Sequence, residues 1–294
     1  MPSQLPDYSE SVRDAVADYW EVRRSQADES ESRGVINTGI RAEVTGGRHL
    51  DALHELVVAV FVDAGIPARL IDVKRRPIAG YFRRDKSWDI VVMVAVGRRG
   101  PVDRTGRRDK SWDIVVMVAD RVVGIVELKS MAGNSPGQNY NNRTDEALGQ
   151  AVDVWKAVER EIIRPLRPWL GYFMLLEDND AFTTPVTLRK AVWEPDSAFD
   201  DASYADRYVI FFERMVRERL LDAACVVLAD KDSATVRFPS DSVSFQAFAA
   251  AIHGRCLQFM ATNPDIDWSA GSNQFIPGFP VNGFRRRRRG DLIG

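Results

Sequence analysis

The spacing of apolar residues predicts several amphipathic helices along the chain. Apolar side chains recur every three to four positions in residues 9–25, and again in residues 48–64 and 143–161. This period places them on one side of a helix. Residues 204–228 read as a long helix that ends in a strand, and residues 243–261 as a last helix. These segments are expected to cover a core built from the remaining apolar runs.

The middle of the chain has the pattern of buried strands. Residues 114–118 and 122–128 are apolar runs separated by a short polar turn, and residues 171–176 form another such run. The first two runs predict a hairpin. Because it is apolar on both faces, we expect it at the centre of a covered sheet. Strict alternation puts Val122 on the face of Val126, and Val123 on the face of Ile125. The predicted fold class is α/β, with a central mixed β-sheet flanked by helices.

A perfect repeat interrupts this pattern. Residues 83–95 recur letter for letter as residues 107–119, at an offset of 24 positions. Repeats that build a fold diverge in sequence and come in threes or more. We therefore interpret the two copies as a recent in-frame duplication, or as an error in the gene or its sequence. The connector, residues 96–106, is rich in Gly and Arg, which indicates an exposed loop.

The composition is that of an ordinary globular protein, with 45% hydrophobic residues, 28% charged residues and a net charge of −2. No apolar run reaches the roughly 20 residues of a membrane-spanning helix, and no signal peptide is visible. Cys225 and Cys256 are expected to be buried free thiols. We expect a cytoplasmic bacterial protein without membrane contact. One domain over residues 1–262 and a poorly ordered, Arg-rich tail over residues 263–294 complete this prediction.

The charges are unevenly distributed. Basic residues outnumber acidic ones between Lys74 and Lys110, whereas acidic residues dominate residues 1–32. A basic stretch on a nearly neutral chain indicates contact with a polyanion. A solvated charged loop is the alternative interpretation.

Two carboxylates and a lysine lie at the open end of the predicted hairpin. A turn centred on Asp120 places Asp113 opposite Glu127, and Lys129 shares the face of Glu127. Directly opposed Cβ atoms lie about 5 Å apart, so the two carboxylates could bind one Mg²⁺ ion between them. They would repel each other without a cation. The alternative is a salt-bridged hairpin with no catalytic role.

The residues around the hairpin make this pattern more specific. Asp113 on one strand and Glu127-Leu128-Lys129 on the next match the PD-(D/E)xK nuclease superfamily. Together with the ordered string around them, the chain resembles the XhoI family of type II restriction endonucleases over roughly residues 10–260. That string includes Trp112, Ser130, Gly133, Ser135, Gly137, Arg143, Glu146 and Asp153.

The resemblance implies a PD-(D/E)xK core and a Mg²⁺-dependent enzyme of a restriction–modification system. Such an enzyme cuts both strands of double-stranded DNA at the palindrome CTCGAG, and a cognate DNA methyltransferase acts on the same site. A palindromic target implies a homodimer. Asp113, Glu127 and Lys129 match the catalytic positions of the family. The carboxylates would bind the metal, and Lys129 would orient the attacking hydroxide. Glu55, on the preceding helix, is a further catalytic candidate, with an ordinary exposed glutamate as the alternative.

Candidate DNA-binding residues directly follow the hairpin, in an expected loop over residues 131–142. Asn and Gln pair bidentately with adenine and Arg with guanine, so this segment offers base contacts. The alternative for Asn142 is to cap the helix expected from Arg143. Arg41 is a candidate for contact with phosphate. The full set is Gln138, Asn139, Asn141, Asn142, Arg143 and Arg41.

The duplication leaves two candidate aspartates, because Asp89 in the first copy is chemically identical to Asp113 in the second. We favour Asp113, since a short hairpin forms locally. A second hypothesis is a sequence-specific DNA-binding protein with impaired catalysis. In that case the duplication misregisters the hairpin, and a slip of one residue turns every side chain to the other face. A third is a nuclease of the same superfamily that acts in repair or on branched DNA.

Overall fold

A computed structural model describes most of the chain. The described residues are 5–32, 48–67, 73–74, 77–83, 85–87, 91–94, 114–118, 121–164, 166–187, 192–264 and 268. Arg41, Asp89, Asp113, the connector between the repeat copies and the Arg-rich end of the chain lie outside them, as does the side chain of Gln138.

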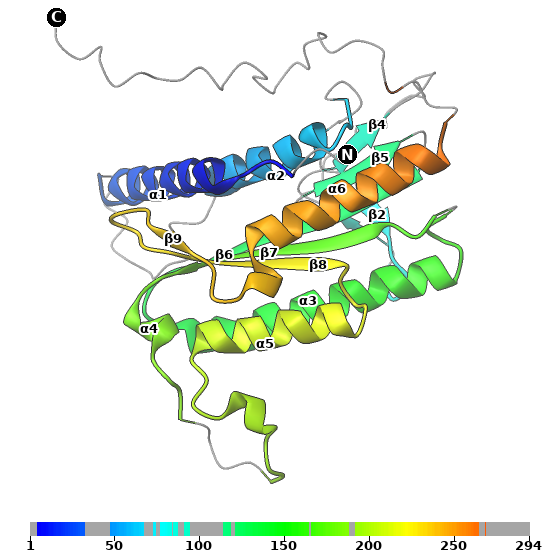
Figure 1. Cartoon of the computed structure of the whole chain (residues 1–294). Coiled ribbons are helices and arrows are strands. Elements are labelled where there is room, and N and C mark those ends of the chain that lie inside the picture. The colour runs from blue at the N-terminus through cyan, green and yellow to red at the C-terminus, as the bar shows by residue number, and fades with distance from the viewer. Residues whose placement is uncertain are drawn as a thin grey trace, which may run out of the picture.

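A mixed sheet of seven described strands forms the centre of the fold (Figure 1). Its order is β1-β4-β5-β6-β7-β8-β9. β6, β7 and β8 run parallel, whereas β5 is antiparallel to β6. The strands are β1 (Val73–Lys74), β4 (Val91–Val94), β5 (Ile114–Val118), β6 (Arg121–Met131), β7 (Trp169–Glu177), β8 (Ala223–Ala229) and β9 (Val236–Arg237). A separate antiparallel pair joins β2 (Pro77–Ala79) to β3 (Asp85–Ser87).

Helices cover both faces of the sheet, which confirms the predicted α/β fold class (Figure 1). α1 (Ser9–Ser32), α2 (Asp51–Asp63) and α6 (Phe245–Thr262) lie over one face, here called the α2 face. α3 (Pro136–Glu159) and α5 (Tyr204–Arg217) lie over the other, the α3 face. Shorter turns are η1 (Arg48–Leu50), α4 (Asp180–Thr183), η3 (Ser197–Phe199) and η4 (Asp241–Val243). Among the described helices, none is long and apolar enough to cross a membrane.

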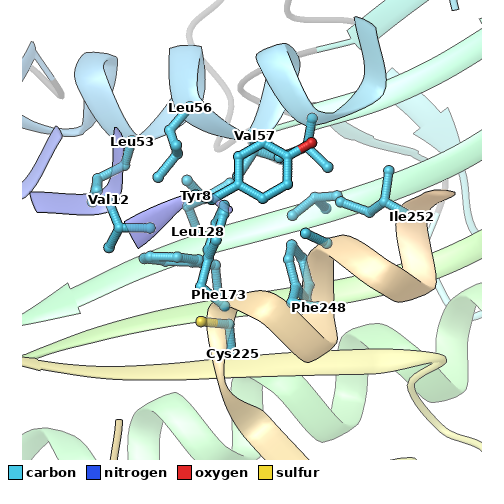
Figure 2. Packing of buried hydrophobic residues seen from close by; sticks show 14 of the residues in the cluster. Tyr8, Val12, Leu53, Leu56, Val57, Leu128, Phe173, Cys225, Phe248 and Ile252 are labelled. Carbon is cyan, nitrogen blue, oxygen red and sulfur yellow. The ribbon is translucent and has the colours of Figure 1, made fainter. Parts of the chain in front are cut away.

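Large apolar side chains fill the space between the α2 face and its helices (Figure 2). Leu53 of α2 and Phe248 of α6 are fully buried against Leu128 and Phe173 of the sheet. Each such side chain contributes about 1.5–3 kcal/mol through burial. Cys225 lies in the same layer, and it and Cys256 are buried free thiols, as predicted.

Two helix ends differ from the prediction. α1 continues to Ser32, beyond the predicted end at residue 25. α3 begins at Pro136 rather than Arg143, so the predicted loop over residues 131–142 is wrong from residue 136 onward. Ser135 is the N-cap residue and Pro136 lies in the first turn, where proline is favoured because that turn needs no amide donor. Asn142 lies inside α3, so the alternative that it caps the helix is also wrong.

β5 and β6 form the predicted hairpin, but a bulge interrupts it. Val118 pairs with Arg121 next to the connection, and further out Ile114 pairs with Val126. The offset between the strands changes by one residue in between, and Val123 is the extra residue on β6. A bulge of this kind breaks the alternation of side chains along a strand.

The bulge changes which face two valines occupy. Val123 packs with Val126 on the α2 face, and Val122 packs with Ile125 on the α3 face. The strict alternation expected for Val122 and Val123 is therefore wrong. Beyond the bulge the alternation resumes.

Both repeat copies contribute a strand to the sheet. β4 from the first copy and β5 from the second pair in parallel, with Val91 opposite Val115 and Val94 opposite Val118. Identical residues of the two copies thus lie side by side. It is the second copy that pairs with β6, as the favoured interpretation expected, whereas the first copy pairs on its other side with β1.

One buried carboxylate fastens the β2–β3 connection to α3. Asp153 is 6% exposed. Its Oδ1 accepts hydrogen bonds from the backbone amides of Tyr81 at 2.9 Å and Phe82 at 2.7 Å. Its Oδ2 accepts one from Nε of Arg83 at 3.0 Å. These contacts hold the connection between β2 and β3 against α3.

We expect Asp153→Ala to lower the free energy of unfolding by about 3 kcal/mol, because three hydrogen bonds to a charged group are lost. Urea denaturation of the two proteins measures this difference. Asp145→Ala on the exposed side of the same helix serves as the control and should change stability by less than about 0.5 kcal/mol. A similarly small effect of Asp153→Ala would contradict the fastening role.

Candidate active site

β6 places Glu127 and Lys129 together on the α3 face. The two residues are two positions apart on a strand, so their side chains point the same way. Glu127 is 1% exposed and Lys129 is 14% exposed, and Nζ of Lys129 forms an ion pair with Oε1 of Glu127. On the neighbouring parallel strand, Tyr172 lies beside Glu127 and Met174 beside Lys129. A buried carboxylate of this kind is costly unless cations surround it.

The ion pair belongs to a larger charged group that includes the first half of α3. Tyr172 is fully buried, and burial raises its pKa well above the ordinary value. The fields of Lys129 and Arg143 lower that pKa, and those of Glu127 and Glu146 raise it. Nη1 of Arg143 donates to Oε2 of Glu146 at 2.9 Å. Two carboxylates and two cations from β6 and α3 therefore gather around one phenol.

The chemistry of Glu127 suits a hard divalent cation. Mg²⁺ prefers carboxylate oxygens and commonly takes only one or two from the protein. Within the part of the chain that the structure describes, no group of three His, Cys, Asp or Glu side chains is placed to hold a metal ion. Asp113, the second predicted ligand, lies outside that part. Among the described residues, Glu127 thus offers one carboxylate of the kind that Mg²⁺ binds.

Comparison with known proteins assigns the chain to a family. A family model described as restriction endonuclease XhoI matches residues 29–99 and 102–240. The chain belongs to the XhoI family of restriction endonucleases. The resemblance seen in the sequence is confirmed, and with it the prediction of a restriction endonuclease. Each matched segment contains one copy of the repeat.

Three curated relatives of this endonuclease are type II restriction enzymes. BstVI of Geobacillus stearothermophilus is 36% identical over 66% of this chain and 80% of its own length. XhoI of Xanthomonas vasicola is 29% identical over 74% of this chain and 78% of its own length. AbrI of Azospirillum brasilense is 31% identical over 60% of this chain and 70% of its own length. No solved structure gives a significant match.

The candidate DNA-binding residues whose side chains the structure describes lie on α3. Asn139, Asn141 and Asn142 are exposed in the first turns of this helix. Arg143 is half-buried, and its charge acts on Tyr172 beside the ion pair of β6. The structure therefore places Arg143 near the candidate active site, whereas the three asparagines are exposed on the same helix.

Glu55 is not brought to this site. It is exposed on α2, which covers the opposite face of the sheet. Partial burial and the nearby carboxylates of Asp51 and Asp18 raise its pKa, while His54 lowers it. Its electrostatic neighbours thus belong to α1 and α2 rather than to β6.

Two residues of the site escaped the sequence analysis. Glu146 belonged to the family string without an assigned role, although its spacing of three from Arg143 is typical of an ion pair on a helix. The predicted helix over residues 143–161 already contains both residues, so this signal was available from the sequence. Tyr172 lies within an apolar run and carries no sequence signal.

Proposed function

We propose that this endonuclease is a type II site-specific deoxyribonuclease that cuts both strands of double-stranded DNA with Mg²⁺ as cofactor. The observation that carries the proposal is the Glu127–Lys129 ion pair on the α3 face of β6. It lies within the segment that matches the restriction endonuclease family.

In this proposal Asp113 and Glu127 hold the metal. β5 starts at Ile114, which pairs with Val126, so the next residues outward along the two chains are Asp113 and Glu127. A metal bound there supplies Lewis-acid stabilisation of the charge that develops on the scissile phosphate. Asp89 is the alternative ligand if the first copy takes the place of β5.

Lys129 has the role of orienting the attacking water. Its ammonium group has three donors and no acceptor, and its ion pair with Glu127 fixes it at the candidate metal site. A donor so placed can hold a hydroxide or a phosphate oxygen. Arg143, whose positive charge acts on Tyr172 as that of Lys129 does, would contact a DNA phosphate or a base next to the cleaved bond.

The exposed start of α3 is the proposed DNA-reading surface. Asn139, Asn141 and Asn142 offer amide groups that pair with adenine edges, and Gln138 and Arg41 complete the proposed set. The expected target is CTCGAG, and its two-fold symmetry calls for a homodimer. A cognate DNA methyltransferase would modify the same site and need not bind this protein.

The direct test is a digest of linear DNA that carries one CTCGAG site. We expect two discrete fragments with Mg²⁺, none with EDTA, and none from DNA in which the site is scrambled. Cleavage of the scrambled DNA or cleavage in EDTA would contradict the proposal. Specific binding without cleavage would favour the DNA-binding hypothesis, and a preference for branched DNA would favour a repair nuclease.

A further inference from the structure

The bulge in β6 is held by a side chain from a distant helix. Arg255 of α6 donates from Nε to the carbonyl oxygen of Val123 at 2.9 Å. Its Nη2 donates to the carbonyl oxygen of Arg167 at 3.0 Å, and its Nη1 to Oε1 of Gln258 at 3.0 Å. One guanidinium therefore joins the bulge of β6, the chain just before β7, and α6.

This contact meets a need that the bulge creates. Val123 has no partner in the pairing of β6 with β5 or with β7. A residue left out of the ladder in a covered sheet still needs an acceptor or donor for its backbone groups. Arg255 provides the donor, and it is itself held over the ring of Phe259 at 5.7 Å from the ring centroid.

The bulge decides which residues face each other at the open end of the hairpin. Without it, the register next to the connection would continue and pair Ile114 with Ile125. The residue before Ile114, Asp113, would then pair with Val126. Paired residues share a face of the sheet and neighbouring residues do not, so Asp113 and Glu127 would lie on opposite faces. The extra residue shifts the register by one and pairs Ile114 with Val126. Continuing this register by one pair would match Asp113 with Glu127 on one face.

We propose that Arg255 is a positioning residue for DNA cleavage. By holding the bulge at Val123, it sets the register that matches Glu127 with the aspartate preceding β5. This inference rests on the proposed function, because it takes Asp113 and Glu127 as ligands of one metal.

The experiment combines Arg255→Ala with deletion of Val123. The deletion removes the extra residue and leaves Val116 opposite Gly124, so the outer pairs keep their partners in a regular ladder. The register then no longer depends on Arg255. We expect Arg255→Ala to slow cleavage at least about 10-fold in the intact chain, as loss of a residue that supports metal ligands typically does. In the deletion background the same substitution should change the rate less than about threefold.

The Mg²⁺ requirement separates positioning from a general loss of folded protein. Misplaced ligands raise the Mg²⁺ concentration for half-maximal cleavage, whereas partial unfolding lowers the rate without moving that concentration. Arg255→Lys, which retains one donor, should restore part of the rate. The control is Arg24→Ala on α1. It removes a similar hydrogen bond, from Nη1 of Arg24 to the carbonyl oxygen of Lys231 at 2.9 Å, and should leave cleavage unchanged.

The outcomes distinguish this inference from the function on which it rests. Cleavage by the Arg255→Ala protein at the full rate would overturn the inference, and so would an equal loss in both backgrounds. If Arg255→Ala does not fold, the comparison of the deletion variant with and without the substitution still decides. If neither the intact chain nor any variant cuts the palindrome, the proposed function fails and the inference fails with it. Loss of cleavage in Glu127→Gln but not in Arg255→Ala would overturn the inference alone.

Discussion

Glu127→Gln should reduce DNA cleavage by at least about 100-fold while the protein stays folded. The substitution keeps the size of the side chain and an oxygen that accepts a hydrogen bond from Lys129, but it removes the charge that binds a cation. Residues that merely support a metal ligand typically contribute about 10- to 100-fold in affinity or activity, so loss of a ligand should exceed that range. Single-turnover cleavage of a one-site DNA at several Mg²⁺ concentrations measures the effect.

A second buried glutamate provides the matched control for this substitution. Glu177 lies at the end of β7, is 5% exposed, and accepts a hydrogen bond from the amide of Gly133 at 2.7 Å. Glutamine can accept the same bond, so Glu177→Gln should leave cleavage within a few-fold of the unmodified enzyme. Equal losses in both variants would show that burial of a carboxylate, rather than its place beside Lys129, explains the effect. Circular dichroism establishes that both variants are folded.

Asp113→Ala should abolish cleavage, whereas Asp89→Ala should leave most of it. The reason is the order of the strands: β5 of the second copy pairs with β6, and β4 of the first copy is one strand further away. We expect a loss of at least about 100-fold for Asp113→Ala and less than about threefold for Asp89→Ala, on the same reasoning about ligands and remote residues. Cleavage rates of the two variants test this directly. The reverse result would mean that the first copy lies next to β6 in the active enzyme.

Deletion of residues 96–119 gives this comparison an internal control. The deletion removes one copy and joins the other to residue 120, so the strand of the first copy becomes the neighbour of β6 in the chain. In that background Asp89→Ala should abolish cleavage. Persistence of cleavage after this double change would argue that neither aspartate binds the metal.

The sequence alone could predict the hairpin and the residues on β6, because these depend on local patterns. Alternation along one strand places Glu127 and Lys129 on one side regardless of what surrounds the sheet. The bulge at Val123 has one local mark, because a glycine within a strand, here Gly124, often accompanies a bulge. That mark does not fix the register, and Arg255, which holds the bulge, is remote in the chain. The start of α3 was signalled by Ser135 and Pro136, but the Gly and Asn residues that follow are weak helix formers and obscured it.

The position of Glu55 shows a different limit. The apolar stripe of its helix predicts that one side is buried, but it does not say which face of the sheet that side covers. Tertiary packing put α2 on the face opposite Glu127. Conversely, Glu146 and Tyr172 reach the site only because α3 and β7 pack against β6, which no local pattern reports.

The pairing of β4 with β5 shows how a sheet can gain a strand in a single genetic event. These parallel strands of identical sequence pair each residue with its own copy along the backbone, as the in-register strands of amyloid fibrils do. A strand-length duplication can thus widen a protein's sheet by one strand, here β4, which lies between β1 and its copy β5.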